Sequence, residues 1–137
     1  MFDTRRHHQN KMKKILIVDD NSDIRRLIRI ALGKTFDISE AEDGTSGLQM
    51  ARDLLPDLMV LDIMMPGQMD GLQVLDAIRC DPGLDAVRVV LVTAKGQLGD
   101  AETGMQHGAD AYFVKPFSPL QLTAFIQETV DKGALHV

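Results

Sequence analysis

Acidic residues stand at the ends of two apolar runs that have the length of buried strands. Asp19 and Asp20 follow the run KILIV, and Asp62 follows the run LMVL. Three carboxylates brought together raise one another's pKa unless a cation lies between them. Ligation by oxygen alone, with no Cys or His cluster, favours Mg²⁺ or Mn²⁺ over zinc. The pattern therefore predicts a divalent-cation site, provided that the two runs lie side by side.

A hydroxyl and an ammonium group are placed at two later apolar runs. Thr93 ends the run VRVVLVT, and Lys115 follows AYFV. A hydroxyl donor, an ammonium group and a divalent cation can together bind a phosphoryl group, whose transfer depends mainly on positioning and charge neutralisation. Carboxylates are competent phosphoryl nucleophiles, and Asp62 stands alone at the end of its run. Asp62 is therefore the candidate acceptor of a phosphoryl group.

Five apolar runs, each followed by a longer amphipathic stretch, must position these side chains. Strands separated by helices predict a parallel sheet with right-handed crossovers. Runs that are apolar at consecutive positions predict strands covered by helices on both faces. We therefore expect one doubly wound α/β domain over residues 13–133, with ligands bound outside the carboxyl ends of the strands. The expected strands are residues 14–19, 36–41, 57–63, 87–94 and 111–117.

The size and composition of the chain favour a single globular domain. With 137 residues and 45% hydrophobic content, it is long enough to bury about two-thirds of its unfolded surface. The longest apolar runs are far shorter than the roughly 20 residues that span a bilayer. No apolar leader opens the chain, and the single Cys80 supports no internal disulfide. We expect a cytoplasmic protein that makes no membrane contact.

Charge is distributed unevenly along the chain. The net charge is −5, yet residues 1–14 hold five Lys or Arg against one acid, which leaves ten Lys or Arg against nineteen acids elsewhere. Because an acidic surface repels phosphates, direct DNA binding is not expected. Residues 1–12 have too few apolar side chains to fold alone, so we expect a disordered basic extension or, alternatively, a functional basic tail. Residues 134–137 form a short tail.

Four short motifs, each at the end of its own expected strand, occur in the order ILIVDDN, VLDIMMP, LVTA and FVKPF. Together they resemble the receiver domain of two-component response regulators, in its stand-alone, chemotaxis-type form, over about residues 13–131. The resemblance implies a flavodoxin-like fold, with a five-stranded parallel sheet of order 2-1-3-4-5 flanked by five helices. It also implies a phosphorylation-activated switch in a phosphorelay. Such a protein is not an enzyme beyond catalysing its own phosphorylation and slow dephosphorylation.

The resemblance assigns a phosphoryl acceptor and a set of metal ligands. Asp62 would accept the phosphoryl group from the phosphohistidine of a sensor histidine kinase or phosphotransfer protein. Asp20 and Asp62 would ligate Mg²⁺, with Mn²⁺ as a possible substitute, and Asp19 would act through a metal-bound water. Met64 would contribute its backbone carbonyl.

The resemblance also assigns the residues that bind the phosphoryl group and respond to it. Thr93, Ala94 and Lys115 would bind its oxygens. Tyr112, three residues before Lys115, would swing inward as Thr93 is drawn toward the phosphate. The peptide bond between Lys115 and Pro116 would be cis, as is usual in similar receivers.

The expected readout of phosphorylation is a change on the face built from the fourth helix, the fifth strand and the fifth helix. The segment QLGDAETGMQHG, residues 97–108, is less apolar than the other helices and contains Gly104, which indicates a loosely packed element. We expect a monomer or weak dimer that acts on a separate output protein, because residues 134–137 are too short for an effector domain.

The chain departs from the commonest receiver pattern in one loop. Two further positions bear on the rate at which the phosphoryl group is hydrolysed. The loop of residues 66–70 is one residue longer, which a surface loop tolerates. Met64 and Lys95 lie two positions beyond the acceptor and the threonine, where similar receivers tune hydrolysis. Because apolar Met64 offers no group to orient an attacking water, we expect a longer-lived phosphoryl group.

Two other classes of function use similar residues. Phosphatases of the haloacid dehalogenase type also combine a strand-end Asp with Thr, Lys and Mg²⁺. In those enzymes the nucleophile comes first and a second Asp follows two residues later, whereas here the acid pair opens the chain and Met64 occupies that place. A phosphorylation-independent interaction module is the second alternative. Receiver-like domains of that kind usually lack part of the acidic pocket, which is complete here.

Overall fold

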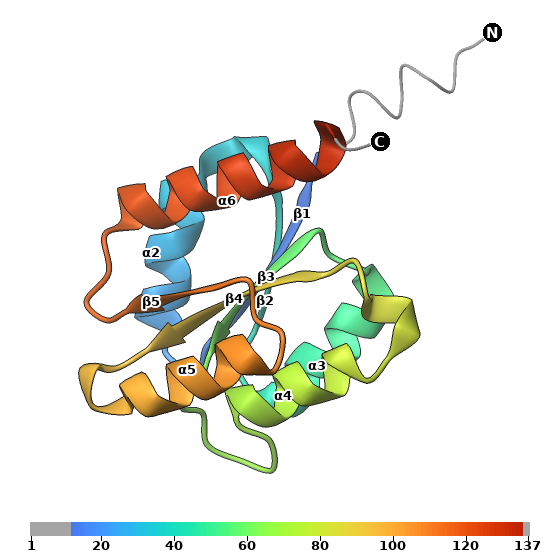
Figure 1. Ribbon diagram of the computed structural model, residues 1–137. Helices are drawn as coiled ribbons and strands as arrows, with labels where there is room; N and C mark the ends of the chain where they lie inside the picture. Colours follow the sequence, from blue (N-terminus) through green and yellow to red (C-terminus); the bar gives the residue numbers. More distant parts are fainter. Residues whose placement is uncertain (1–11, 136–137) are drawn as a thin grey trace, which may run out of the picture.

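Within residues 12–135, which the computed structural model describes, five strands alternate with five α-helices (Figure 1). Side chains are described to residue 131. The predicted basic extension lies outside the described residues except for Met12. The strands are β1 (Lys14–Val18), β2 (Asp37–Ala41), β3 (Leu58–Asp62), β4 (Arg88–Thr93) and β5 (Ala111–Val114). The helices are α2 (Ser22–Leu32), α3 (Gly44–Leu54), α4 (Gly71–Arg79), α5 (Leu98–Gln106) and α6 (Pro119–Leu135). Single 3-10 turns are η1 (Gly33–Thr35), η2 (Pro82–Leu84) and η3 (Lys95–Gln97).

The strands form one parallel sheet in the order β2-β1-β3-β4-β5, as predicted. The strand β3 lies at its centre, with Val18 of β1 in register with Leu61. On the other side, Asp62 is in register with Val92 of β4. This order carries the carboxyl ends of β1, β3 and β4 to the same edge, where α/β proteins bind ligands.

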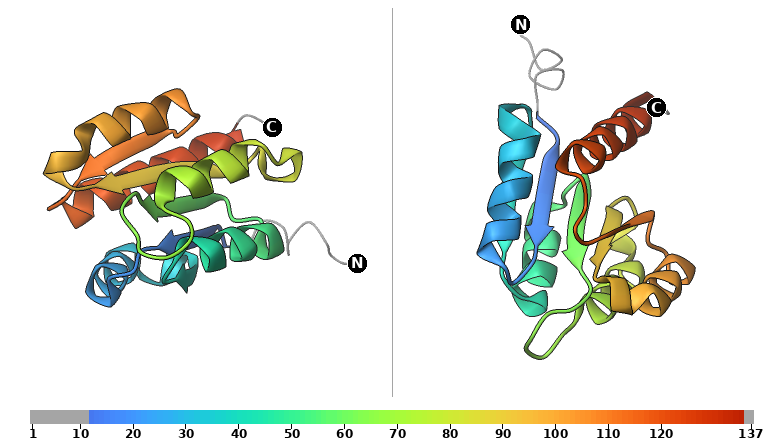
Figure 2. Two further views of the ribbon diagram at one scale, coloured as in Figure 1. Left: turned by 90° about the horizontal axis from the view of Figure 1, so that it is seen from below. Right: turned by 90° about the vertical axis from the view of Figure 1, so that its left-hand side faces the viewer.

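Two apolar layers hold the helices against the sheet. The helices α2 and α6 pack on one face, and α3, α4 and α5 pack on the other (Figure 1 and Figure 2). Consecutive residues of β3 serve both layers, since Val60 faces the α2–α6 side and Leu61 faces the other. Successive side chains of a strand point to opposite faces, so a strand covered on both faces is apolar at every position. The predicted doubly wound fold is confirmed.

Local capping explains why helices start immediately after the strand ends. Asn21 accepts hydrogen bonds from the backbone N–H groups of Asp23 and Ile24 and so caps α2. Asp70 caps α4 and forms a capping box with Gln73. The helices therefore begin at the edge of the sheet that carries the acidic residues.

The fifth strand is shorter than the sequence predicts. The expected range ran to residue 117, but β5 ends at Val114. Pro116 has no N–H to donate to a ladder, and the Lys115–Pro116 peptide bond is cis, as the resemblance implies. The backbone N–H of Lys115 still donates to the carbonyl of Thr93 over 2.7 Å, so Lys115 stays at the edge where the carboxylates gather. Among the described residues, no helix is both long enough and apolar enough to cross a membrane.

Candidate functional site

Three carboxylates come together where β1 and β3 end. Asp19 and Asp20 follow β1, and Asp62 is the last residue of β3. One oxygen of each carboxylate lies within 4.8 Å of the others. Asp19 and Asp62 are only 2% and 3% exposed, whereas Asp20 faces solvent. The structure therefore brings together the three acids that the sequence analysis singled out, with one of them open to the outside.

Lys115 supplies the positive charge beside these acids. Its Nζ lies 3.3 Å from Oδ2 of Asp19 and 3.4 Å from Oδ2 of Asp62. Burial alone would lower the pKa of Lys115, but the charges of Asp62 and Asp19 outweigh it and raise that pKa. Lys115 therefore stays protonated, and its ammonium group pairs with two of the three carboxylates.

Asp62 is the acid whose ionisation is most disturbed. Burial, followed by the negative charge of Asp19, raises the pKa of Asp62 from 3.8 to about 6, although Lys115 and the backbone N–H of Met64 oppose the shift. That N–H donates to Oδ1 of Asp62 over 3.3 Å. One lysine therefore leaves negative charge uncompensated in this site. A cluster of carboxylate oxygens with excess negative charge has the chemistry that Mg²⁺ and Mn²⁺ prefer.

Asp19 is braced by residues that the sequence analysis did not single out. Its Oδ1 accepts a hydrogen bond of 2.9 Å from the backbone N–H of Asn21. Its carbonyl oxygen accepts one of 2.6 Å from Nη1 of Arg25, which also pairs with Glu40 at 2.9 Å. Burial would raise the pKa of Glu40, but hydrogen bonds from Arg29 and Arg25 lower it overall. The available signal was two arginines four residues apart, on one helix face, beside an acid in the neighbouring strand.

Thr93 and Ala94, which were predicted to bind the phosphoryl group, form hydrogen bonds within the turn that follows β4. Thr93 is fully buried, and its hydroxyl donates toward the carbonyls of Gln97 at 3.2 Å and Ala94 at 3.3 Å. The backbone N–H of Ala94 donates to the side-chain oxygen of Gln97 at 3.3 Å. Tyr112, the predicted switch aromatic, is 40% exposed. The Thr93 hydroxyl therefore points toward the turn after β4, and the Tyr112 side chain is partly exposed to solvent.

The loop after β3 returns to the sheet despite its extra residue. Gly67 has φ of 100°, a conformation that glycine adopts without strain. The backbone N–H of Gly71 then donates to the carbonyl of Ile63 over 2.8 Å. The side chain of Met64, two residues beyond Asp62, is 64% exposed. A hollow of about 700 Å³ opens between this loop and the start of α3, and Asp20 forms part of its wall.

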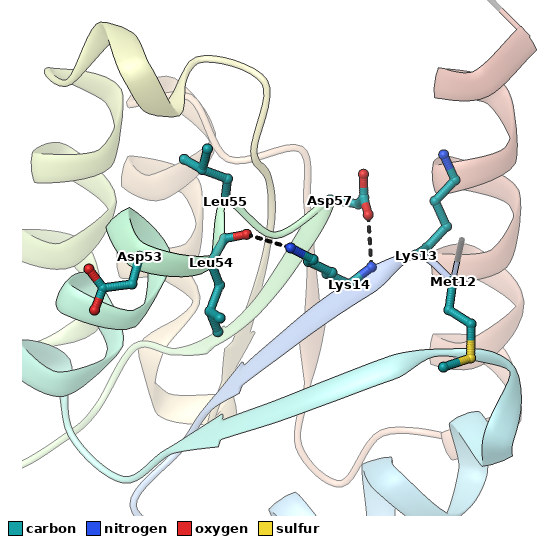
Figure 3. A pocket seen from close by; sticks show the side chains of 7 residues that line it. All are labelled: Met12, Lys13, Lys14, Asp53, Leu54, Leu55 and Asp57. Atoms are coloured by element: carbon teal, nitrogen blue, oxygen red, sulfur yellow. Dashed lines mark hydrogen bonds between the residues drawn. The ribbon is translucent and has the colours of Figure 1, made fainter. Parts of the chain in front are cut away.

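A second hollow, of about 390 Å³, lies at the opposite end of the sheet, and its polar groups serve the fold (Figure 3). Asp57 accepts a hydrogen bond of 2.7 Å from the backbone N–H of Lys14. The ammonium group of Lys14 donates to the carbonyl of Leu54 at 3.3 Å. These bonds tie the start of β1 to the end of α3 and the start of β3. This hollow lies away from the carboxyl edge, where the candidate site is built.

The motif order and the site geometry match a known family. The family model described as response regulator receiver domain matches residues 15–127. The chain belongs to the response regulator receiver family. Receiver domains are signalling switches of two-component systems and not classical enzymes. The phosphatase and phosphorylation-independent alternatives are accordingly not favoured.

Relatives of this receiver include both short and long proteins. DNA-binding response regulator MtrA from Mycolicibacterium paratuberculosis is 40% identical over 122 residues, which cover 88% of this chain and 52% of that protein. A CheY-like receiver domain protein from Methanospirillum hungatei superposes with a TM-score of 0.81 at 29% identity, covering 93% of this chain and 100% of the other. NtrX from Brucella abortus, solved with ADP, gives 0.82 at 30% identity, with coverage of 92% and 29%. This receiver spans about half the length of the curated relatives it matches.

The predicted set of partners is wrong. It excluded direct DNA binding, but curated relatives of this receiver are named DNA-binding response regulators. NtrX also extends well beyond the part that matches this chain. The prediction failed because the acidic balance describes the receiver unit, and repulsion of phosphates by that surface says nothing about the remaining length of the relatives. The expectation of a separate output protein is withdrawn as well, because that expectation rested on chain length alone.

Proposed function

We propose that this receiver is switched by transfer of a phosphoryl group to Asp62 in a Mg²⁺-dependent reaction. The observation that carries the proposal is the position of Asp62 at the end of the central strand. There it lies beside Asp19 and Asp20 and 3.4 Å from the Lys115 ammonium group. Because the pKa of Asp62 is about 6, its carboxylate is mostly ionised at neutral pH and is available as a nucleophile.

The carboxylates form the cation-binding part of the proposed site. Receiver domains bind Mg²⁺ in an acidic pocket, and the donor set here fits that ion. Asp19, Asp20 and Asp62, with the backbone carbonyl of Met64, would hold Mg²⁺ or Mn²⁺. When bound, the cation neutralises charge on the phosphoryl oxygens. Lys115 contributes a second positive charge from the protein itself.

Phosphoryl transfer is a displacement at phosphorus in which Asp62 is the incoming group. An oxygen of the Asp62 carboxylate forms a bond to phosphorus as the P–N bond of a phosphohistidine breaks, and the imidazole leaves with the bonding electron pair. The backbone N–H of Ala94 and the hydroxyl of Thr93 then donate to the phosphoryl oxygens. Asp20 and the hollow beside it leave this edge open to the phosphodonor. Transfer of this kind depends on positioning and charge neutralisation, which these groups supply.

The phosphoryl group adds a charge of roughly −1.5 to −2, which draws the Thr93 hydroxyl toward Asp62 and vacates space for Tyr112 to turn inward. The surface affected is the face of α5, β5 and α6. In α5 only Ala101 and Gly104 are buried, so this helix is held by few apolar contacts. This face exists in two conformations, and phosphorylation shifts the equilibrium between them. That shift is the signal passed to the output.

The lifetime of the phosphoryl group depends on residues beside the acceptor. The Met64 side chain is apolar and exposed, so it offers no group to orient a water for attack on phosphorus. Lys95 lies in η3 at the corresponding position beyond Thr93. We place this receiver among those with slow dephosphorylation.

Removal of Mg²⁺ is expected to block phosphorylation of the wild-type protein. Incubation with acetyl phosphate and Mg²⁺ should add the mass of one phosphoryl group to the intact protein, because the cation and Lys115 together neutralise the incoming charge. A matched sample with a chelator should show no gain. Equal gain in both samples would contradict the metal-dependent mechanism. Steady turnover of a simple phosphate ester, with no stable mass gain, would instead indicate a phosphatase.

A further inference from the structure

The turn after β4 contains a residue that engages both predicted phosphate donors of that segment. Gln97 accepts the Thr93 hydroxyl at its backbone carbonyl over 3.2 Å. It accepts the backbone N–H of Ala94 at its side-chain Oε1 over 3.3 Å. The backbone N–H of Gln97 in turn donates to the carbonyl of Ala94 over 2.9 Å. One residue thereby closes the turn and occupies two donors.

These donors stand next to the proposed acceptor. Asp62 is in register with Val92, and the N–H of Ile63 donates to the Val92 carbonyl over 3.0 Å. Thr93 and Ala94 follow directly along the chain at the same edge. A phosphoryl oxygen carries charge and is a stronger acceptor than the neutral amide of Gln97. Phosphorylation would therefore set up a competition between Gln97 and the phosphoryl group for the same hydrogen atoms.

We propose that Gln97 is a latch that stabilises the unphosphorylated form by occupying the donors of Thr93 and Ala94. This inference rests on the proposed function and adds a regulatory residue to it. Forming the phosphorylated state requires Gln97 to release at least the Ala94 N–H. The energy of that release sets how readily Asp62 is phosphorylated.

The position of Gln97 links this release to the proposed output face. Gln97 is the residue immediately before α5, and its side chain makes no capping hydrogen bond to that helix. Its side-chain acceptor is directed to Ala94 instead. Leu98, the first residue of α5, is 46% exposed. Movement of Gln97 would therefore free the first turn of α5, which few apolar contacts hold in place.

Two substitutions of Gln97 should change the phosphorylation rate in opposite directions. Gln97→Ala removes the side-chain acceptor, so phosphorylation by acetyl phosphate with Mg²⁺ should be roughly fivefold faster, the factor expected for one competing hydrogen bond. Gln97→Glu places a carboxylate on the same N–H and repels the phosphoryl group, so it should slow the reaction by a similar factor. Gln106→Ala, an exposed position at the other end of α5, serves as the control and should match wild type.

The rate is measured by the increase in intact mass, and the melting temperature of each variant checks the fold. A merely structural role for Gln97 does not predict acceleration by alanine and slowing by glutamate. An unchanged or slower phosphorylation rate for Gln97→Ala, with an unchanged melting temperature, would contradict the proposed role of Gln97. Equal acceleration in Gln106→Ala would also overturn it. If wild type, phosphorylated in parallel, gains no mass, the proposed function fails and the latch fails with it.

Discussion

Asp62→Asn is expected to raise the free energy of unfolding of the metal-free protein by roughly 1–3 kcal/mol at neutral pH. In the folded protein, burial and the charge of Asp19 raise the pKa of Asp62 from 3.8 to about 6. Ionising this carboxyl therefore costs more in the folded protein than in the unfolded chain. At 1.36 kcal/mol per pKa unit the shift corresponds to at most about 3 kcal/mol. Asparagine carries no charge, and its single oxygen can still accept from either Lys115 or the Met64 N–H, which contact different oxygens of the carboxylate.

The stabilisation by Asp62→Asn should depend on pH in a defined direction. Well below pH 3.8 the carboxyl is protonated in both the folded and unfolded states, so its ionisation contributes no difference. As pH rises through 3.8 the unfolded chain releases its proton while the folded site retains it until about pH 6. Wild type therefore loses stability relative to the variant across this interval, and the difference is constant at higher pH.

Chemical denaturation at pH 4 and pH 7 in the presence of a chelator measures this difference. Asp57→Asn is the matched control, because Asp57 is an acid at the opposite end of the sheet and accepts a hydrogen bond from the Lys14 N–H. That control should give no gain in stability. Added Mg²⁺ should reduce the advantage of Asp62→Asn, since a ligand that binds the folded wild type stabilises it. Equal or lower stability of Asp62→Asn at pH 7 would contradict the charge account.

Gly71→Ala is expected to destabilise the protein by about 3 kcal/mol, because the added methyl group has no space. Gly71 is the first residue of α4, and a Cβ there would overlap the carbonyl oxygen of Asp62 and lie 2.6 Å from the Cα of Ile63. Both atoms belong to the backbone at the end of β3, so relief requires moving the strand end that carries Asp62. Urea denaturation should show the loss as a lower midpoint at an unchanged slope.

Gly99→Ala provides the comparison for this substitution. Gly99 lies in α5, and a Cβ there meets no atom within 4 Å. Alanine is the better helix former, so Gly99→Ala should leave stability unchanged or raise it by up to about 1 kcal/mol. A Gly71→Ala variant as stable as wild type would show that the end of β3 can shift at little cost. That result would contradict the rigid placement of Asp62.

The fold could be predicted from the sequence because short apolar runs at consecutive positions, alternating with amphipathic stretches, are typical of parallel strands covered on both faces. The run ending at Asp62 is of this kind, and its residues divide between the two apolar layers as expected. The site could also be predicted from the sequence, because residues at the carboxyl ends of parallel strands lie at the same edge of the sheet whatever the details of packing. Asp19, Asp62 and Lys115 meet for this reason.

The details that sequence patterns missed depend on individual side-chain conformations. Arg25 reaches the carbonyl of Asp19, and Gln97 folds back onto Ala94. The spacing of Arg25 and Arg29 places both on one helix face but does not identify the carbonyl that Arg25 contacts. The three-residue spacing from Ala94 to Gln97 fits a capping-box contact only once a helical turn is known to start there. The end of β5 at Val114 was missed because the apolar pattern continues through Phe117 although Pro116 leaves the ladder. Charge balance likewise described the surface of the receiver and failed as a guide to its partners.

Locating the phosphoryl group is the most direct test that Asp62 is the acceptor. After phosphorylation with acetyl phosphate and Mg²⁺, borohydride reduction converts an aspartyl phosphate to homoserine, which peptide mass mapping can place. We expect homoserine at position 62 in wild type, and neither homoserine nor a gain in intact mass for Asp62→Asn. Homoserine at Asp19 or Asp20, or equal phosphorylation of Asp62→Asn, would contradict the assignment of Asp62 as the acceptor.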